Sequence, residues 1–264
     1  MDPHVVQRVI HGRTYRYHRL LDLIYYDSWE LGAELVRTQV NEIVDLCIEV
    51  TSACNLFCVN CFGDCGPHRL GKSMPSAEVV RLQDVHRDAI VRLALTGGEP
   101  LLHPEAEALL ELPQRFPECG YVLYTNGSVR FDLDKAIIAN QWLAAVSLHG
   151  RRASHNRYTR SDSFDTVARR IADLAPQTPV HIYATLHEDL TEGDLEWLVK
   201  FRDESGAKFL RLIVPRMGGR HGGQADSELA TAIAGRPLDQ RAAVKRTPSL
   251  TTFVTVSGEH RPSR

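Results

Sequence analysis

The chain has 264 residues, with 31 Lys and Arg against 33 Asp and Glu, which gives a net charge of −2 at pH 7. This length can bury the core of one α/β barrel domain, so we expect a single catalytic domain with terminal extensions. The balanced charge excludes an overall basic field that would attract nucleic acid or an anionic membrane surface.

Residues 1–42 are expected to form an N-terminal extension packed on this domain. The apolar positions between Tyr25 and Val40 have a spacing compatible with a helix on the outside of the fold. The first residues, Met1–His4, lack the basic and apolar regions of a secretory signal, and no run of 18 apolar residues occurs. We therefore expect a soluble protein.

Residues 43–215 alternate between short apolar runs and amphipathic stretches. The apolar runs are rich in β-branched residues, as in buried parallel strands, and they cover 44–50, 91–96, 121–125, 143–148, 180–186 and 209–214. Helices are predicted at 76–90, 104–116, 132–140, 164–174 and 193–205. This order predicts about six βα units, whose parallel sheet curls into a partial or complete barrel.

Residues 216–264 differ in character from the rest. Glycines surround Arg220 and His221, and an Ala-rich stretch, expected to be a helix, precedes a polar tail. The segment suggests no function of its own.

Three cysteines, Cys54, Cys58 and Cys61, follow the first predicted strand with the spacing C-x3-C-x2-C. Thiolates are soft ligands for iron–sulfur clusters or zinc, and three from one loop leave one iron of a [4Fe–4S] cluster open for chemistry. The alternative is a zinc site in which Cys65 is the fourth ligand, with His68 close behind. Because an oxidising compartment would damage such a loop, we expect a cytoplasmic protein.

Polar and glycine-rich motifs follow the next three predicted strands. They are Thr96–Pro100 (TGGEP), Tyr124–Gly127 (YTNG) and Ser147–Gly150 (SLHG). Because active sites of parallel α/β folds gather at the carboxyl ends of the strands, these motifs and the cysteine loop should share one rim. Each motif taken alone is also explained by turn chemistry.

The cysteine spacing and the GGEP motif, in this order, resemble the radical S-adenosylmethionine (radical SAM) superfamily over roughly residues 43–215. The resemblance implies a partial (β/α)6 barrel, a [4Fe–4S] cluster and S-adenosylmethionine (SAM) as cofactors. One departure is Asn60, where family members commonly have an aromatic residue before the third cysteine; Phe62 follows it instead.

The resemblance also implies roles for named residues. Gly97, Gly98, Glu99 and Pro100 would contact the methionine end of SAM, with Glu99 accepting from its ammonium group. Thr125 and Asn126 either satisfy turn backbone groups or reach the ribose. Ser147 would lie near the methionine carboxylate, for which Arg157 or Arg160, from a loop crowded with arginines, could be a partner.

Other candidate residues keep two interpretations. His149 and His155 could be acid–base groups or hydrogen-bonded structural residues. Cys65 could serve the substrate or merely neighbour the cluster. Cys47 is expected in the core, and Cys119 either in the core or exposed.

The resulting hypothesis is an enzyme that cleaves SAM reductively to methionine and a 5′-deoxyadenosyl radical, which removes hydrogen from a small-molecule or natural-product substrate. The resemblance implies an external electron donor of the flavodoxin or ferredoxin type, and we expect no nucleic acid or membrane partner. The alternatives are a peptide-modifying enzyme of the same superfamily and a non-catalytic zinc or iron–sulfur binding module. Because no cysteine follows Cys119, further clusters in the C-terminal segment are not expected.

Overall fold

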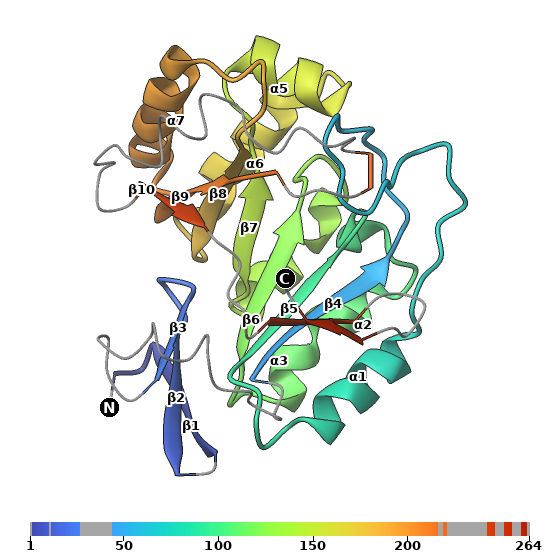
Figure 1. Ribbon diagram of the computed structural model, residues 1–264, viewed down its shortest axis with the longest axis vertical. Helices are drawn as coiled ribbons and strands as arrows, with labels where there is room; N and C mark the ends of the chain where they lie inside the picture. Colours follow the sequence, from blue (N-terminus) through green and yellow to red (C-terminus); the bar gives the residue numbers. More distant parts are fainter. Residues whose placement is uncertain are drawn as a thin grey trace.

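The computed structural model describes residues 2–10, 12–26, 44–215, 219–220, 242–245, 251–254 and 260–262. Its centre is a sheet of six parallel strands that lie side by side in chain order (Figure 1). They are β4 (Asp45–Thr51), β5 (Arg92–Gly97), β6 (Gly120–Thr125), β7 (Leu143–Ser147), β8 (Val180–Thr185) and β9 (Phe209–Ile213). The sheet curves without closing, so the predicted partial barrel is confirmed and a complete barrel is excluded.

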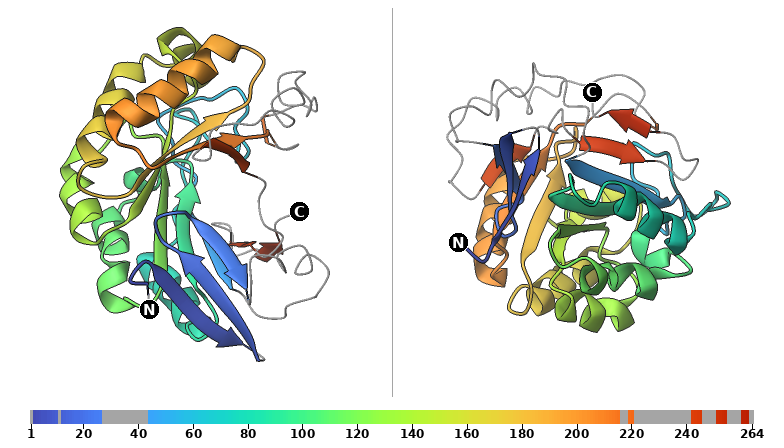
Figure 2. Two further views of the ribbon diagram at one scale, coloured as in Figure 1. Left: turned by 90° about the vertical axis from the view of Figure 1, so that its left-hand side faces the viewer. Right: turned by 90° about the horizontal axis from the view of Figure 1, so that it is seen from below.

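Helices follow the strands and cover one face of the sheet (Figure 2). They are α1 (Ser76–Val85), α2 (Ala106–Leu110), α3 (Leu112–Arg115), α4 (Asp134–Ala139), α5 (Arg152–Thr159), α6 (Phe164–Leu174) and α7 (Glu192–Ser205). The predicted helix at 104–116 is divided into α2 and α3, because Pro113 has no N–H for a continuous ladder. None of the described helices is long and apolar enough to cross a membrane.

Helix α5 corrects the expectation of an arginine-crowded loop. Its sequence is strongly polar and lacks a side-chain cap, so its pattern gives little helical signal. The buried side chains of His155, Tyr158 and Thr159 anchor it in the fold. Tertiary packing therefore determines this helix.

The N-terminal segment forms an antiparallel meander in its described part: β1 (Val5–Ile10), β2 (Arg13–His18) and β3 (Leu23–Tyr26). Tyr25 and Tyr26 belong to β3, whereas the remainder of the predicted helix at 25–40 lies outside the described residues. Successive side chains of β2 point to opposite faces of the strand, as in any β-strand, and this places Tyr15 and Tyr17 together on the buried face. The meander packs on the face of the sheet opposite the helices, whereas the N-terminal extension was expected on the outside of the fold.

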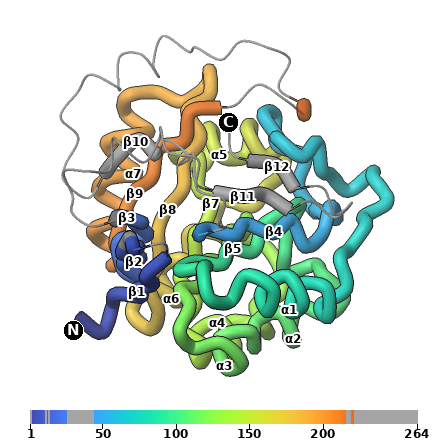
Figure 3. The backbone as a smooth tube through the Cα atoms, turned by 60° about the horizontal axis from the view of Figure 1, so that its bottom comes forward, coloured from blue at the N-terminus to red at the C-terminus, as the bar shows by residue number. Residues whose placement is uncertain are grey.

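The central sheet, seen from another side in Figure 3, is extended by short strands of the C-terminal segment at both edges. Strand β10 (Ala242–Lys245) pairs with β9, β11 (Thr251–Val254) pairs with β4, and β12 (His260–Pro262) pairs with β11. These described residues form strands, where the sequence suggested a polar tail. They are too short for a periodic pattern, which is why sequence analysis missed them. The predicted Ala-rich helix lies outside the described residues.

A buried ionic group joins the meander to the inner face of the sheet. Arg92 of β5 pairs with Asp22, just before β3, and with Asp45 of β4, at N–O distances of 2.6 Å and 2.7 Å. The hydroxyls of Tyr17 and Tyr183 donate to the two carboxylate oxygens of Asp22. Because a buried charge is costly unless paired, this group fixes the meander beneath the barrel.

Candidate functional site

One cavity of about 170 Å³ lies at the carboxyl ends of the central strands, and Cys54, Cys58 and Cys61 all line it. The cysteine loop leaves β4 and is held against the end of α5. Backbone N–H groups of Phe57 and Val59 donate to the carbonyls of Thr159 and Tyr158, at 3.3 Å and 2.9 Å. The loop that carries the three thiols is therefore held by backbone contacts to another element.

The remaining walls of the cavity come from three strands and from α5. Beside the cysteines, the cavity is lined by Leu56, Thr96, Gly97, Gly98, Tyr124, Thr125, Asn126, Ser147, His149, His155 and Thr159. All four motifs that the sequence placed on one rim thus contribute to one cavity. Among the predicted cofactor residues, Gly97, Gly98, Thr125, Asn126 and Ser147 are brought together here.

The thiols differ in their pKa values. Burial raises the pKa of Cys54 to about 11 and that of Cys58 to about 12. A hydrogen bond from Cys65 lowers the pKa of Cys61 to about 6. Metal binding must therefore displace protons from two of the thiols.

The donor set fits an iron–sulfur cluster. Three thiolates from one loop can each bind a different iron of one cluster. Cys65 is buried, and its backbone N–H donates to the Cys61 sulfur at 3.2 Å. That contact supports Cys61 as a ligand without requiring the Cys65 thiol.

Gly97 and Gly98 lie against the backbone at the end of β4. A Cβ at Gly97 would be 2.1 Å from the Thr51 oxygen, and one at Gly98 would be 2.2 Å from the Ala53 oxygen. The N–H of Gly98 donates to Thr51, and that of Glu99 donates to Ala53, both at 2.7 Å. The glycines therefore allow the turn to approach the residue that precedes Cys54.

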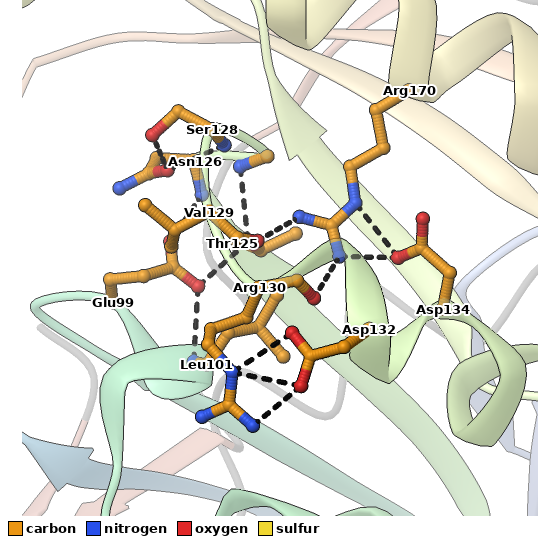
Figure 4. A network of polar contacts seen from close by, with 11 residues as sticks. Glu99, Leu101, Thr125, Asn126, Ser128, Val129, Arg130, Asp132, Asp134 and Arg170 are labelled. Atoms are coloured by element: carbon orange, nitrogen blue, oxygen red, sulfur yellow. Dashed lines mark hydrogen bonds and ion pairs between the residues drawn. The ribbon is translucent and has the colours of Figure 1, made fainter.

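Glu99 is fully buried and points toward the end of β6 (Figure 4). Its carboxylate accepts from the Thr125 hydroxyl and the Asn126 N–H, both at 2.7 Å, and from the Leu101 N–H at 3.1 Å. Burial raises the pKa of Glu99, and these hydrogen bonds oppose the rise. The carboxylate therefore ties β5 to β6, whereas its contact with the ammonium group of SAM stays a prediction.

Thr125 makes the turn contact that the sequence allowed, whereas contact of Thr125 or Asn126 with the ribose stays a prediction. The Thr125 hydroxyl accepts from the Gly127 N–H at 3.0 Å, as in a turn, and also donates to Glu99. The Asn126 amide donates to Asn55 of the cysteine loop at 3.0 Å. Both residues line the cavity while holding its walls together.

Four of the predicted cofactor residues lie outside the cavity lining: Glu99, Pro100, Arg157 and Arg160. Arg157 is exposed and pairs with Asp189 at 2.8 Å. The Arg160 guanidinium lies 5.2 Å from the centre of the Phe57 ring. The structure therefore does not bring either arginine to the site, and a role for them at the SAM carboxylate stays a prediction.

Histidines form a neutral wall of the cavity. His149 accepts from the Thr185 N–H at its Nδ1, at 3.0 Å, so the proton of the neutral ring is on Nε2. Burial, followed by repulsion from His155 and His187, lowers the pKa of His149 well below its usual value. His149 therefore offers the cavity an N–H donor at neutral pH. His155 uses both ring nitrogens within the protein, at the N–H of His149 and the hydroxyl of Ser163.

Arg220 also reaches the cysteine loop, and sequence analysis gave it no role. Its guanidinium donates to the carbonyls of Cys58 and Cys65. The only sequence signal was an arginine among glycines in a segment without a recognisable pattern.

Comparisons with known proteins agree with this geometry. The model of the Radical SAM superfamily matches residues 48–202. GTP 3′,8-cyclase from Chlorobaculum tepidum is 30% identical over 163 residues, covering 60% of this chain and 49% of the cyclase. GTP 3′,8-cyclase from Rhodococcus opacus is 29% identical over 168 residues, covering 59% and 48%. The chain thus spans about half the length of the curated relatives it matches.

Solved structures show the same fold. Streptococcus suis SuiB bound to S-adenosylmethionine superposes with a TM-score of 0.76 at 11% identity, covering 100% of this chain and 82% of SuiB. The anSMEcpe protein with bound AdoMet gives a TM-score of 0.52 at 25% identity, covering 64% and 50%. The family uses a [4Fe–4S] cluster and SAM, which the thiols and the cavity of this chain suit. The family match, which covers more than half of the chain, identifies it as a member of the radical SAM superfamily.

Proposed function

We propose that Cys54, Cys58 and Cys61 hold the [4Fe–4S] cluster and that the chain is an enzyme that initiates radical chemistry on a small-molecule substrate. When bound, the cluster supplies the electron that cleaves SAM to methionine and a 5′-deoxyadenosyl radical, which takes a hydrogen atom from the substrate. One observation carries the proposal: the three thiols share a cavity with Gly97, Gly98 and the ends of β6 and β7.

The protein's own groups would bind and orient the cofactor. The backbone at Gly97 and Gly98 and the side chains of Thr125, Asn126 and Ser147 surround the cavity next to the thiols. Polar groups at this rim can fix a charged amino acid end and a ribose, while buried walls exclude water. Neutral His149 adds a donor for an acceptor oxygen, and its Nδ1 lone pair is already occupied by the Thr185 N–H.

A small-molecule substrate is supported by the curated relatives, whose name describes the cyclisation of a nucleotide, GTP. The alternative is a peptide substrate, because SuiB has also been solved bound to the precursor peptide SuiA. At 12% identity that likeness shows the fold alone. An external one-electron donor of the flavodoxin or ferredoxin type and a reducing, cytoplasmic setting belong to the same proposal, since the reaction consumes an electron.

The proposal is tested by SAM cleavage under oxygen-free conditions. Protein reconstituted with iron and sulfide should release 5′-deoxyadenosine from SAM when dithionite is added, and a Cys58→Ala variant should release none. Mass analysis with nucleotides and with peptides then separates the two substrate classes. A fully loaded, reducible cluster that forms no 5′-deoxyadenosine would contradict the proposed function.

A further inference from the structure

The C-terminal segment contacts the cysteine loop at Gly219 and Arg220. The Arg220 N–H donates to the Cys61 carbonyl at 3.0 Å, and its guanidinium donates to the carbonyls of Cys58 and Cys65. The guanidinium also pairs with Asp64 at 3.1 Å. Arg220 thus contacts the cysteine loop at three places: at the third cysteine, Cys61, before it at Cys58, and after it at Cys65.

The arginine is largely enclosed. Its side chain is 14% exposed, and the guanidinium lies 3.5 Å from the centre of the Phe57 ring. Stacking on an aromatic face and bidentate donation are both properties that a lysine would not reproduce. The Asp64 carboxylate that pairs with it is 30% exposed, so solvent screens the carboxylate more than the guanidinium.

Gly219 provides a second, independent observation. Its φ is +58°, and a Cβ there would be 2.2 Å from the Phe62 oxygen and 2.3 Å from the Cys61 oxygen. Only glycine allows the backbone to approach the loop so closely in this conformation. Gly219 and Arg220 are therefore both the residue types that close contact with the cysteine loop requires.

We propose that Arg220 is a positioning residue for the cluster-binding loop and that its positive charge makes the bound cluster easier to reduce. The inference rests on the proposed assignment of the cluster to Cys54, Cys58 and Cys61. Fixing the carbonyls on both sides of Cys61 holds that thiolate in its ligating position. Because reduction adds a negative charge to the cluster, a nearby cation stabilises the reduced form.

Three variants separate the two effects. Arg220→Gln removes the charge and the paired hydrogen bonds to the carbonyls of Cys58 and Cys65. Arg220→Lys keeps the charge but loses the planar group that donates to both carbonyls at once. Gly219→Ala keeps the arginine but displaces the segment. Arg69→Gln is the matched control, because Arg69 is exposed and also pairs with Asp64.

The experiment uses the reconstituted full chain and two readouts other than activity. The first is the midpoint potential from a redox titration followed by electron paramagnetic resonance (EPR), and the second is the rate of iron loss to a chelator. In Arg220→Gln we expect the ratio of reduced to oxidised cluster at a fixed potential to fall at least about tenfold, which corresponds to about 59 mV for a one-electron couple.

The other variants have distinct expected outcomes. Arg220→Lys should keep the wild-type potential but lose iron several-fold faster, Gly219→Ala should also lose iron faster, and Arg69→Gln should match wild type in both readouts. A wild-type potential in Arg220→Gln, or a tenfold change in Arg220→Lys, overturns the role of the charge. Wild-type rates of iron loss in Arg220→Gln and Arg220→Lys overturn the positioning role. Failure of the wild-type protein to hold a cluster would instead contradict the cysteine assignment.

Discussion

At the scale of single residues, burial determines what the carboxylate of Glu99 does. It is enclosed at the end of β5 and accepts three hydrogen bonds from Leu101, Thr125 and Asn126. The glutamate of the GGEP motif therefore has a structural role, holding β5 to β6, whether or not a cofactor is bound.

We expect Glu99→Gln to lower the free energy of unfolding by about 1–3 kcal/mol, because the amide nitrogen of Gln cannot accept a hydrogen bond and leaves a buried donor unpaired. Denaturant unfolding of the apoprotein measures this loss. Glu107→Gln is the control, since the Glu107 side chain is 77% exposed, and it should leave stability unchanged. Equal stability of both variants would show that Glu99 has no structural role.

The close contact between Gly98 and the cysteine loop predicts how a substitution at Gly98 affects cluster binding. A Cβ there would meet the Ala53 carbonyl, one residue before Cys54, so Gly98→Ala should shift the loop and reduce iron content after reconstitution at least several-fold. Gly193→Ala is the control, because its Cβ would meet only the flexible end of Arg151, at 3.2 Å. Equal iron content in the two variants would count against the tight approach of the turn to the loop.

The residues of the site could be predicted only where their chemistry lies in a local motif. Cys54, Gly97 and Asn126 each belong to such a motif, and all three line the cavity. The assignment of Arg157 or Arg160 depended on where a long side chain turns, which local sequence does not determine. Arg220 was missed because it is 162 residues away from Cys58 along the chain.

At the scale of elements, α7 begins with a capping box that also holds α5. Thr191 and Asp194 exchange hydrogen bonds at the helix start, and Asp194 accepts from the backbone and side chain of Arg151. Burial acts to raise the pKa of Asp194, but these hydrogen bonds outweigh it and hold the pKa well below its usual value.

Asp194→Asn should therefore cost about 2 kcal/mol at pH 7, from the loss of a cap and charge-assisted hydrogen bonds. Because the folded pKa is depressed, this stabilisation is present above the unfolded pKa of about 3.9 and is lost as pH falls below it. Thermal unfolding at pH 7 and at pH 3 should show the difference between wild type and variant shrinking. A difference that is the same at both pH values would refute the ionic origin of the effect. The exposed Glu196→Gln on the same helix is the control.

Apart from α5 and the division between α2 and α3, the elements between residues 44 and 213 were predictable, because continuous apolar runs alternate with amphipathic stretches. Helix α6 matches its predicted bounds, 164–174, and has a strong apolar face. The meander β1–β3 and the edge strands β10–β12 were not predicted. Strands β10 and β11 pair with β9 and β4, which come earlier in the chain, whereas the meander is a separate sheet of short consecutive strands.

At the scale of the whole molecule, the meander and the cavity lie in different parts of the barrel. The meander and the ionic group of Arg92, Asp22 and Asp45 occupy the inner face, whereas the cavity with the three cysteines opens at the carboxyl ends of the strands. The two terminal segments thus complete a domain whose chemistry lies in its central residues.

Arg92→Met tests this arrangement. It leaves Asp22 and Asp45 buried without their cation, which should cost about 3–5 kcal/mol in the free energy of unfolding. Arg87→Met removes an exposed pair with Glu118 and should cost much less. Similar losses for the two variants would contradict the view that the meander is held by a buried ionic group.

EPR of the reduced cluster with and without SAM shows whether Cys54, Cys58 and Cys61 hold a cluster to which SAM binds in the shared cavity. We predict that SAM changes the spectrum in the wild type and in Cys65→Ala, whereas Cys58→Ala shows no SAM-sensitive cluster signal. A spectrum that SAM does not alter, or a cluster that survives Cys58→Ala and is lost in Cys65→Ala, would contradict the account.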